Sequence, residues 1–341
     1  MYRITGDFYY FEVVRFFLLC VVAVFCSCHK SGGGSGPTVY TAGEWGNTQY
    51  NVAAYWVNNR LVSLTDTMHV SWARSVYVSG NDVYVSGVIG TTGSAYSNIP
   101  VYWKNGQEVQ LDSGNFDAIA NAIVVANGNV YVAGEDYGYA VYWVNGQETR
   151  LSGAFVSSGV SSMAVSGSDV YLLGIDTLRN PCFWKNGQLT ELPETYASAS
   201  AIAVSGNDVY VAGQQLDTST NNRKAILWKN GVLTSLSDGS QDVVINSIAI
   251  DDTDVYVAGN TGGAGGYVAS VWKNGQLLPL GAGSTDLLYG WGVAAVNGTV
   301  YVGGNVSAPG QVIAAYWSAN GVVELDKNPV QSSTVWGIFV K

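Results

Sequence analysis

Few residues in this chain could act as a general base or a nucleophile. The sequence contains two histidines, and only His69 lies in the repeated part of the chain, so a Ser/His/Asp or Cys/His system would have to use it. Its neighbours do not support such a system. The one cysteine of the repeated part, Cys182, is expected to be a small buried hydrophobic residue. No spacing of histidine and cysteine suits a metal and no phosphate-binding glycine loop precedes a helix, so we expect no metal and no cofactor.

Carboxylates are the remaining candidates for catalysis, and they fall into two groups. Four aspartates recur at one turn position, Asp82, Asp169, Asp208 and Asp254, and are expected to form that turn. The others lie in segments that differ between copies of the repeat: Asp66, Asp117, Glu135, Asp136, Asp176, Asp242 and Asp286. A polysaccharide hydrolase needs two carboxylates at a defined separation. The sequence does not say which of these residues meet.

The elements that must position these residues are copies of one four-stranded unit, best seen in Ser200–Leu236. Its β-branched runs 202–204 and 209–211 predict the first two strands, joined by a tight turn of Ser, Gly, Asn and Asp. Residues 225–228 and 232–236 predict the third and fourth strands. Between them lies Asn230-Gly231, which favours a two-residue type I′ hairpin because both residues accept a positive φ.

Three markers of this unit recur together along the chain. A Val-Tyr pair begins at Val39, Val83, Val130, Val170, Val209, Val255 and Val300. A tryptophan recurs at Trp56, Trp103, Trp143, Trp184, Trp228, Trp272 and Trp317, and is expected to pack between units. A leucine closes each copy, at Leu64, Leu111, Leu151, Leu192, Leu236, Leu280 and Leu325. Seven copies at this period predict an all-β fold, a seven-bladed β-propeller of four-stranded antiparallel blades.

The two ends of the repeated part predict how the ring closes. The first copy begins at its second strand, and Trp336–Val340 aligns with a first strand. The C-terminal strand is therefore expected to pair into the N-terminal blade, which leaves no open sheet edge. The second residue of each predicted first strand is small, as the crowded axis requires: Ser75, Ala122, Ser162, Ala201, Ser247, Gly292 and Gly337.

A candidate binding site comes from the residue that is expected to open each first strand, beside the axis. These residues do not repeat: Arg74, Asn121, Ser161, Ser200, Asn246, Trp291 and Trp336. Trp72 and Tyr289 stand two residues earlier in their copies. They lie on the face that carries the second-to-third and fourth-to-first connections, which vary in length and are here called the variable face. Aromatic, amide and guanidinium groups together suit a sugar or a peptide; alternatively, Trp291 and Trp336 plug the channel.

The composition narrows the class of protein. The chain has 341 residues, 42 of them glycine and 22 tyrosine, with 12% charged residues, which suits an all-β repeat protein in one domain. Its net charge of −10 argues against binding to nucleic acid, which needs a basic face. We expect the charge to serve solubility.

The N-terminal segment predicts export and lipid anchoring. An apolar run at 16–25 follows Arg3 and Arg15 and is too short to span a bilayer, which is typical of a signal peptide. The sequence Phe25-Cys26-Ser27-Cys28 resembles a bacterial lipobox, with Cys28 as the lipidated residue. The predicted organisation is a signal peptide at 1–27, lipidated Cys28 with a Gly/Ser tether at 28–37, and the propeller at 38–341. A plain secretory signal or a short anchor is the alternative.

The repeat also carries a resemblance to a family. The pattern Trp-Lys-Asn-Gly-Gln…Leu followed by Ile-Ala-Val-Ser-Gly-Asn-Asp-Val-Tyr-Val-Ala-Gly resembles the propeller-type repeat lipoproteins of bacterial cell envelopes. The resemblance implies the propeller fold and a place in the bacterial cell envelope, and it supplies no catalytic residues to carry over. We expect a monomer, held by its lipid and facing the periplasm or the exterior. The favoured interpretation is a non-catalytic binding or scaffold protein for a glycan or a protein partner. The alternative is an envelope polysaccharide hydrolase or lyase that uses the carboxylates of the variable face.

Overall fold

The computed structural model describes residues 36–46, 50–90, 98–111, 117–151, 159–192, 194–263, 266–278, 280, 287–308, 311–325 and 332–341. The chain divides into two units, Met1–Gly36 and Pro37–Lys341. Cys28 and the rest of the predicted leader up to residue 35 lie outside the described residues, as does Asp286. In the described part, no helix is long and apolar enough to cross a membrane.

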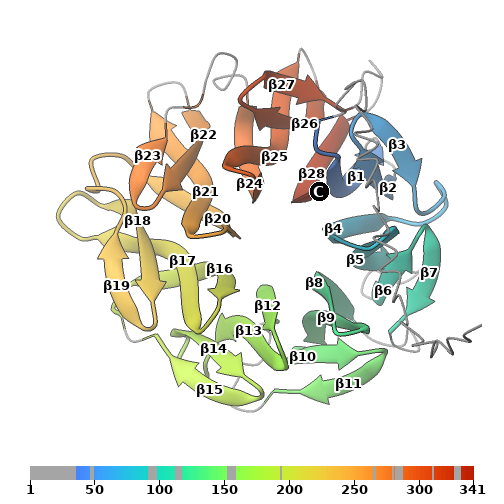
Figure 1. Ribbon diagram of the computed structural model, residues 1–341, viewed down its shortest axis with the longest axis horizontal. Coiled ribbons are helices and arrows are strands. Elements are labelled where there is room, and N and C mark those ends of the chain that lie inside the picture. Colours follow the sequence, from blue (N-terminus) through green and yellow to red (C-terminus); the bar gives the residue numbers. More distant parts are fainter. Residues whose placement is uncertain are drawn as a thin grey trace, which may run out of the picture. The chain divides into compact units, whose positions relative to one another are not determined.

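The unit Pro37–Lys341 consists of seven four-stranded antiparallel sheets, here called blades and given from the axis outward (Figure 1). Blade 1 is β28 (Ser332–Val340), β1 (Val39–Gly46), β2 (Asn51–Val57) and β3 (Arg60–Ser63). Blade 2 is β4 (Ser71–Ser79), β5 (Asp82–Gly90), β6 (Asn98–Lys104) and β7 (Gln107–Gln110). Blade 3 is β8 (Ala118–Ala126), β9 (Asn129–Asp136), β10 (Tyr139–Val144) and β11 (Gln147–Arg150). Blade 4 is β12 (Ser162–Ser166), β13 (Asp169–Ile175), β14 (Pro181–Lys185) and β15 (Gln188–Glu191).

The remaining three blades follow the same order. Blade 5 is β16 (Ala197–Ser205), β17 (Asp208–Asp217), β18 (Asn222–Lys229) and β19 (Val232–Ser235). Blade 6 is β20 (Val243–Asp251), β21 (Asp254–Gly263), β22 (Gly266–Lys273) and β23 (Gln276–Leu278). Blade 7 is β24 (Leu287–Val296), β25 (Thr299–Ala308), β26 (Gln311–Ser318) and β27 (Gly321–Glu324). The predicted all-β, seven-bladed propeller is confirmed.

Blade 1 joins the two ends of the propeller. The C-terminal strand β28 pairs antiparallel with β1, from Val39 opposite Val340 to Gly46 opposite Ser332. The backbone of Thr38 and that of Lys341 exchange two further hydrogen bonds, of 2.8 and 3.0 Å. The predicted closure of the ring by the C-terminal strand is therefore confirmed, and the inner strand of every blade faces the axis (Figure 1).

The face opposite the variable face is formed by tight turns and is here called the turn face. In the Asn-Gly turns other than Asn320-Gly321 both residues have positive φ, for example 52° at Asn105 and 82° at Gly106, as a type I′ turn requires. The Asn105 side-chain oxygen also accepts from the Val83 backbone N–H at 2.9 Å. The same bond forms at Asn58, Asn145, Asn186, Asn230 and Asn274. Asparagine is therefore selected both for its backbone conformation and for a bond to the second strand.

The hydrophobic core lies between neighbouring blades. Among the described residues it forms seven clusters, each built from two adjacent sheets. Trp103 of β6, for example, packs with Ala53 and Tyr55 of blade 1. The recurring tryptophans are all buried, as predicted, so each blade is held by its contacts with the next.

Candidate functional site

The non-repeating residues beside the axis lie on β-bulges of the inner strands. The pairing of inner and second strands shifts register between Ala73 and Ser75, so Arg74 is the extra, unpaired residue. The same shift occurs around Asn121, Ser200, Asn246, Trp291 and Trp336. The sequence pattern places these residues at the start of their strands, and the structure corrects this. Each of these strands begins three or four residues earlier. A bulge turns its side chain out of the regular alternation of the strand, which here frees it from the repeated packing between blades.

A glycine of the second strand makes room for each bulge. A Cβ atom added at Gly43 would lie 1.7 Å from the Thr334 carbonyl oxygen, and one at Gly304 would lie 1.7 Å from that of Tyr289. No side chain could be accommodated at such distances. The residue that follows this glycine varies from blade to blade: Glu44, Val88, Glu135, Ile175, Gln214, Asn260 and Asn305.

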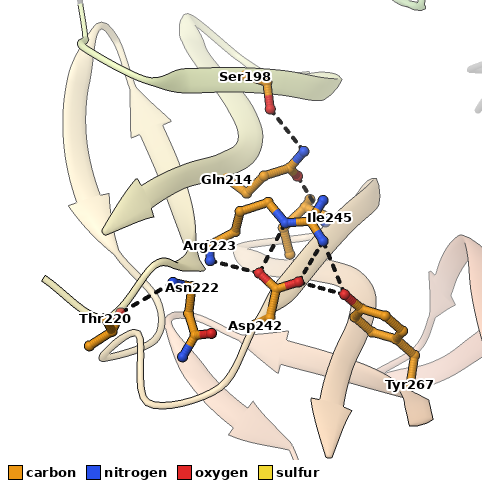
Figure 2. Close-up of polar contacts among 8 residues, drawn as sticks. All are labelled: Ser198, Gln214, Thr220, Asn222, Arg223, Asp242, Ile245 and Tyr267. Carbon is orange, nitrogen blue, oxygen red and sulfur yellow. Dashed lines mark hydrogen bonds and ion pairs between the residues drawn. The ribbon is translucent and has the colours of Figure 1, made fainter. Parts of the chain in front are cut away.

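Three members of this second variable column bind the bulge of the next blade. The Gln214 side-chain oxygen accepts from the Ile245 backbone N–H at 2.9 Å, and its amide nitrogen donates to Ser198 at 2.8 Å (Figure 2). The Asn260 and Asn305 side-chain oxygens accept from the N–H groups that precede the next two bulges, at 2.7 and 3.3 Å. These amides satisfy backbone donors that a bulge leaves without a partner in the sheet.

Four of the seven predicted ligand-binding residues form a contiguous cluster. The rings of Tyr289 and Trp291 are stacked, with centroids 5.7 Å apart and planes at 23°. The ring centroids of Trp291 and Trp336 are 4.9 Å apart, and the Arg74 guanidinium lies 5.5 Å from the centre of the Trp336 ring. These residues come from β24, β28 and β4, the inner strands of three neighbouring blades (Figure 1). The structure therefore brings the aromatic and cationic members of the predicted site together.

A carboxylate that the sequence did not single out completes the cluster. Glu44 of β1 is only 8% exposed, and the Trp336 indole N–H donates to it at 2.5 Å. Burial raises the pKa of Glu44 to about 7, against the opposing effects of the Trp336 hydrogen bond and the Arg74 charge. Burial also lowers the pKa of Arg74, and the Glu44 charge opposes that shift. We call Tyr289, Trp291, Trp336, Arg74 and Glu44 the axial cluster.

The other three predicted residues make different contacts. The Asn121 amide donates to the Val160 carbonyl at 3.0 Å, and the Asn246 amide donates to the Gly290 carbonyl at 2.8 Å. The Asn246 side chain therefore bridges its own bulge to the inner strand of blade 7, and the Asn121 side chain bridges its bulge to the residue two positions before β12. The Trp72 indole N–H faces the Asn51 side-chain amide at 3.0 Å.

Exposed hydrophobic side chains also distinguish the two faces. Those at the variable-face ends of strands and in the connections there are Met68, Val70, Tyr137, Tyr139, Leu178, Tyr196, Val268, Tyr289 and Val312. The other four, Leu61, Leu189, Val232 and Leu277, lie at the turn-face ends of the outermost strands. Within the described ranges, no exposed large hydrophobic residue lies in a turn of the turn face. Concentration of such residues on one face is typical of an interaction surface.

Asp242, one of the carboxylates considered for catalysis, is held in a network between blades 5 and 6 (Figure 2). Arg223 of β18 contacts both of its oxygens, at 2.5 and 3.0 Å, and the Tyr267 hydroxyl of β22 donates to it at 2.5 Å. The Arg223 hydrogen bonds hold the pKa of Asp242 well below its usual range. A carboxylate that stays ionised and fully bonded is suited to joining blades and unsuited to donating a proton.

Most of the remaining carboxylates of the variable face have local partners. Asp66 accepts from the Met68 N–H at 2.9 Å, Asp136 pairs with Arg150 at 2.9 Å, and Asp176 accepts from the Leu178 and Asn180 N–H groups at 2.8 Å. Glu135 differs, because burial and then the nearby charge of Asp117 raise its pKa. Asp117 itself accepts from the Asn98 amide at 2.6 Å. Among the described candidate carboxylates, Glu135 is thus the one whose pKa another of them raises.

The described residues hold no group of three or more His, Cys, Asp or Glu side chains that could bind a metal ion. Cys182 is fully buried, and burial is the main cause that raises its thiol pKa to about 12. A thiol with such a pKa is not a nucleophile at neutral pH. His69 faces Asp66 at 3.1 Å on the outer part of the variable face.

Comparisons with known proteins add little to this description. No family model and no curated protein matches the chain. Similar solved structures include the β-propeller domain of the Trilobed protease from Pyrococcus furiosus, described as having an open velcro topology, with 10% identity, a TM-score of 0.45, and coverage of 76% of this chain and 86% of that one. Pyrococcus horikoshii acylaminoacyl peptidase has 15% identity, a TM-score of 0.46 and coverage of 76% and 46%. Trypanosoma rangeli sialidase has 10% identity, a TM-score of 0.41 and coverage of 67% and 50%.

The chain thus spans about half the length of that peptidase and that sialidase. Likenesses of this degree carry no argument about function, and the fold assignment rests on the strand pairing of the chain itself. The resemblance to envelope lipoproteins stays a prediction.

Proposed function

We propose that this propeller is a non-catalytic binding module that holds a glycan or a protein partner through its variable face. The observation that carries the proposal is the axial cluster, in which Tyr289, Trp291, Trp336 and Arg74 contact one another in series. Trp291, Trp336 and Arg74 occupy bulges where other inner strands hold serine or asparagine. The structural demands on an inner strand are alike in every blade. The blade fold therefore does not explain why large aromatic and cationic side chains occur in only three neighbouring blades. Such residues are the usual energetic anchors of a binding site.

Two features favour a site over a plug of the channel. Tyr289 is 39% exposed, so the aromatic stack extends to the surface. Within the described residues, Arg74 Nε is buried and has no hydrogen-bond partner. The Trp291 indole N–H is also unpaired, but so are those of the core residues Trp56, Trp103, Trp143 and Trp317, so Arg74 carries this point. A buried donor without an acceptor costs about 1–3 kcal/mol. A polar ligand can supply the missing acceptor after a small movement of the Arg74 side chain, whereas a plug gains nothing from leaving it unpaired.

The proposal includes a lipid anchor on Cys28 in a bacterial cell envelope. It is supported by the sequence alone: the short apolar run, Ser27-Cys28 and the Gly/Ser tether. A flexible tether would let a monomeric propeller present its variable face to glycans or proteins of the envelope.

The binding test is a glycan array together with a pull-down, using the full chain in mild detergent. The double variant Arg74→Ala with Trp291→Ala is expected to lose at least 90% of the binding to whichever partner is found, about 1.4 kcal/mol or more. The melting temperature should stay close to that of the unchanged protein. Tyr289→Ala, on an exposed side chain, should weaken binding with no effect on folding.

The matched control changes the turn face. Lys185→Ala with Lys229→Ala removes two exposed cations there, each paired with an aspartate at 2.8 Å. This control is expected to bind normally. A large fall in the melting temperature of the axial variants, with unchanged affinity in the fraction that stays folded, would identify the indoles as a plug. Loss of binding in the lysine variant would place the site on the turn face.

A second candidate, a polysaccharide hydrolase or lyase, is favoured by the pair Glu135 and Asp117. Burial and then the charge of Asp117 raise the pKa of Glu135, and a carboxyl group with a raised pKa can serve as the general acid of such an enzyme. Release of reducing or unsaturated sugar ends from envelope polysaccharides is the test. Activity that Glu135→Gln and Asp117→Asn both abolish would establish the enzyme, and its absence across neutral and acidic polysaccharides would remove this candidate.

A further inference from the structure

Two cavities occupy the same place at two different blade boundaries. One of about 480 Å³ lies between blades 1 and 2, and one of about 460 Å³ lies between blades 5 and 6. Each is lined by the leucine that closes one blade, the hydroxyl residue after it and the next aspartate: Leu64, Thr65 and Asp66 in the first, Leu236, Ser237 and Asp238 in the second. We call them the first and second rim cavities. They lie at the periphery of the variable face and share no residue with the axial cluster.

The same hydrogen bonds build both cavities. Thr65 accepts from the Ala53 backbone N–H at 3.1 Å, and Ser237 accepts from the Ala225 N–H at 2.9 Å. The aspartate then closes a turn by accepting from the N–H two residues on, at 2.9 Å in each copy. The connection between blades thus has the same local conformation at both boundaries. The cavity is a product of the repeat, and its chemistry is set by the residues that differ.

The outer strands make the chemical difference. Glu108 is the second residue of β7, and Leu277 holds the corresponding place in β23. In the first rim cavity, the Gln110 amide donates to Glu108 at 2.9 Å and His69 Nδ1 contacts Asp66 at 3.1 Å. The second cavity has Leu277 at the position of the carboxylate. The first cavity is therefore the polar member of the pair.

The first rim cavity is lined by both polar and aliphatic side chains. The aliphatic ones, here called its aliphatic wall, are Leu64, Ile89 and Ile99. The contacts of Gln110 with Glu108 and of His69 Nδ1 with Asp66 do not involve the second Glu108 oxygen, the Gln110 side-chain oxygen or His69 Nε2. These atoms include acceptors and, at His69, a group that can donate or accept, so together they suit hydroxyl groups. The volume lies within the range of about 300–1,000 Å³ that is usual for small-ligand sites.

The charge of the cavity selects among small ligands. Asp66 and Glu108 both line it, and the chain as a whole carries a net charge of −10. An anionic ligand would be repelled. A neutral sugar ring instead offers hydroxyl groups to the polar side and its C–H surface to the aliphatic wall. We propose that the first rim cavity binds one neutral, hexose-sized sugar ring, as a site separate from the axial cluster.

The test is isothermal titration calorimetry of the full chain with the methyl glycosides of glucose, galactose, mannose and N-acetylglucosamine, and with glucuronic acid. At least one neutral glycoside should bind, and glucuronic acid should bind more weakly. Glu108→Ala with Gln110→Ala should raise the Kd for that glycoside about tenfold or more. Both side chains are exposed, so the variant should fold, and His69→Ala should act in the same direction.

Two controls separate this site from the axial one. Glu148→Ala changes the same strand position in blade 3, where the carboxylate contacts Arg150 at 3.1 Å, and should leave sugar binding unchanged. Arg74→Ala with Trp291→Ala should also leave it unchanged. Lack of binding by every neutral glycoside, or binding that Glu108→Ala with Gln110→Ala does not weaken, would overturn the proposal. If the axial variant alone abolished binding, the sugar would belong to the axial cluster.

Discussion

The indole N–H of Trp336 donates to the carboxylate of Glu44 across 2.5 Å and joins side chains of the last and the first strand of the propeller. The bond therefore links the closure of the ring to the axial cluster. Arg74 of the next blade lies over the same indole, so the carboxylate and the cation both contact Trp336. A change at Glu44 should affect both the fold and the candidate site.

Glu44 should make stability depend on pH. Its pKa is raised from 4.5 to about 7, so between these values the folded protein keeps a proton that the unfolded chain releases. The contribution of Glu44 to the free energy of unfolding is therefore fully present below about pH 4.5 and is lost as the pH rises through 7. The whole loss is about 3 kcal/mol. Urea unfolding at pH 5 and pH 8 measures the loss.

The control for this prediction is Glu44→Gln, which keeps an acceptor for Trp336 and cannot titrate. Other carboxyl groups have lowered pKa values and lose their stabilising contribution as the pH falls. They do so equally in both proteins, so their effect cancels when the two are compared. The unchanged protein should lose stability relative to the variant between pH 5 and pH 8. Parallel curves for the two proteins would contradict the assignment of a raised pKa to Glu44.

Asp242 should show the opposite pH dependence. Arg223 and Tyr267 hold its pKa below the usual range, so its contribution is present at neutral pH and is lost as pH falls below about 4. Because Arg223 is 39% exposed, we expect no more than about 1 kcal/mol from the pair. Asp242→Asn should lower the free energy of unfolding at pH 7 and have less effect at pH 3. An equal effect at both pH values would show that the charge does not matter.

How far the sequence predicts this structure depends on the range of the signal. The blades follow from local patterns, because β-branched runs, Asn-Gly turns and the recurring tryptophan each specify a strand or a turn within one copy. The aromatic members of the candidate site were found because Trp291 and Trp336 break a repeat that their neighbours obey. Their contact with each other follows from the ring, which places β24 beside β28.

The bulges and Glu44 could not be predicted in the same way. A bulge adds one residue to the inner strand and leaves the apolar pattern on either side intact, so the pattern predicts strands that begin at Arg74 and its equivalents. Nothing local marks Glu44 in its second strand, since its partner Trp336 lies at the other end of the chain. One signal was available: the position after the repeating glycine varies, from Glu44 to Asn305, as much as the bulge position does.

The asparagine of the Asn-Gly turns should contribute through two separable effects. Asn230→Gly keeps the positive φ of 52° but removes the 2.8 Å bond to the Val209 N–H. Asn230→Ala removes the bond and places a less suitable residue in the left-handed region. We expect a loss of about 1 kcal/mol for glycine and about 2 kcal/mol for alanine. Asn320, which has no such bond to a second strand among the contacts described and no positive φ, is the control, and Asn320→Ala should cost less than either.

Cys28 should determine where the protein is found. Lipidation there would hold the chain in the membrane fraction, so Cys28→Ser should release it into the soluble fraction or leave an uncleaved precursor. Cys26→Ser is the matched control, since Phe25 before it is a poor neighbour for cleavage, and should leave the protein membrane-bound. Fractionation with mass spectrometry of the N-terminal peptide gives the answer, and an unmodified Cys28 would contradict the lipoprotein prediction.

Deletion of Trp336–Lys341 should destabilise the whole propeller. The deletion removes half of the pairing between β28 and β1, including the partners of Val39 to Ala42, and breaks the bond between Trp336 and Glu44. Blade 1 would lose the C-terminal half of its inner strand, and the part of β1 from Val39 to Ala42 would become an open edge, exposed to water and to other chains. The cost should be several kcal/mol, a large part of the roughly 5–15 kcal/mol typical of a domain.

Because the core lies between blades, the loss should spread from blade 1 to its neighbours on both sides, and unfolding should remain one cooperative transition at a lower temperature. Calorimetry of the truncated and complete chains tests this, with Trp336→Phe separating the loss of the hydrogen bond from the loss of the strand. A truncated protein that melts within a degree or two of the complete one would show that the ring does not depend on its C-terminal strand.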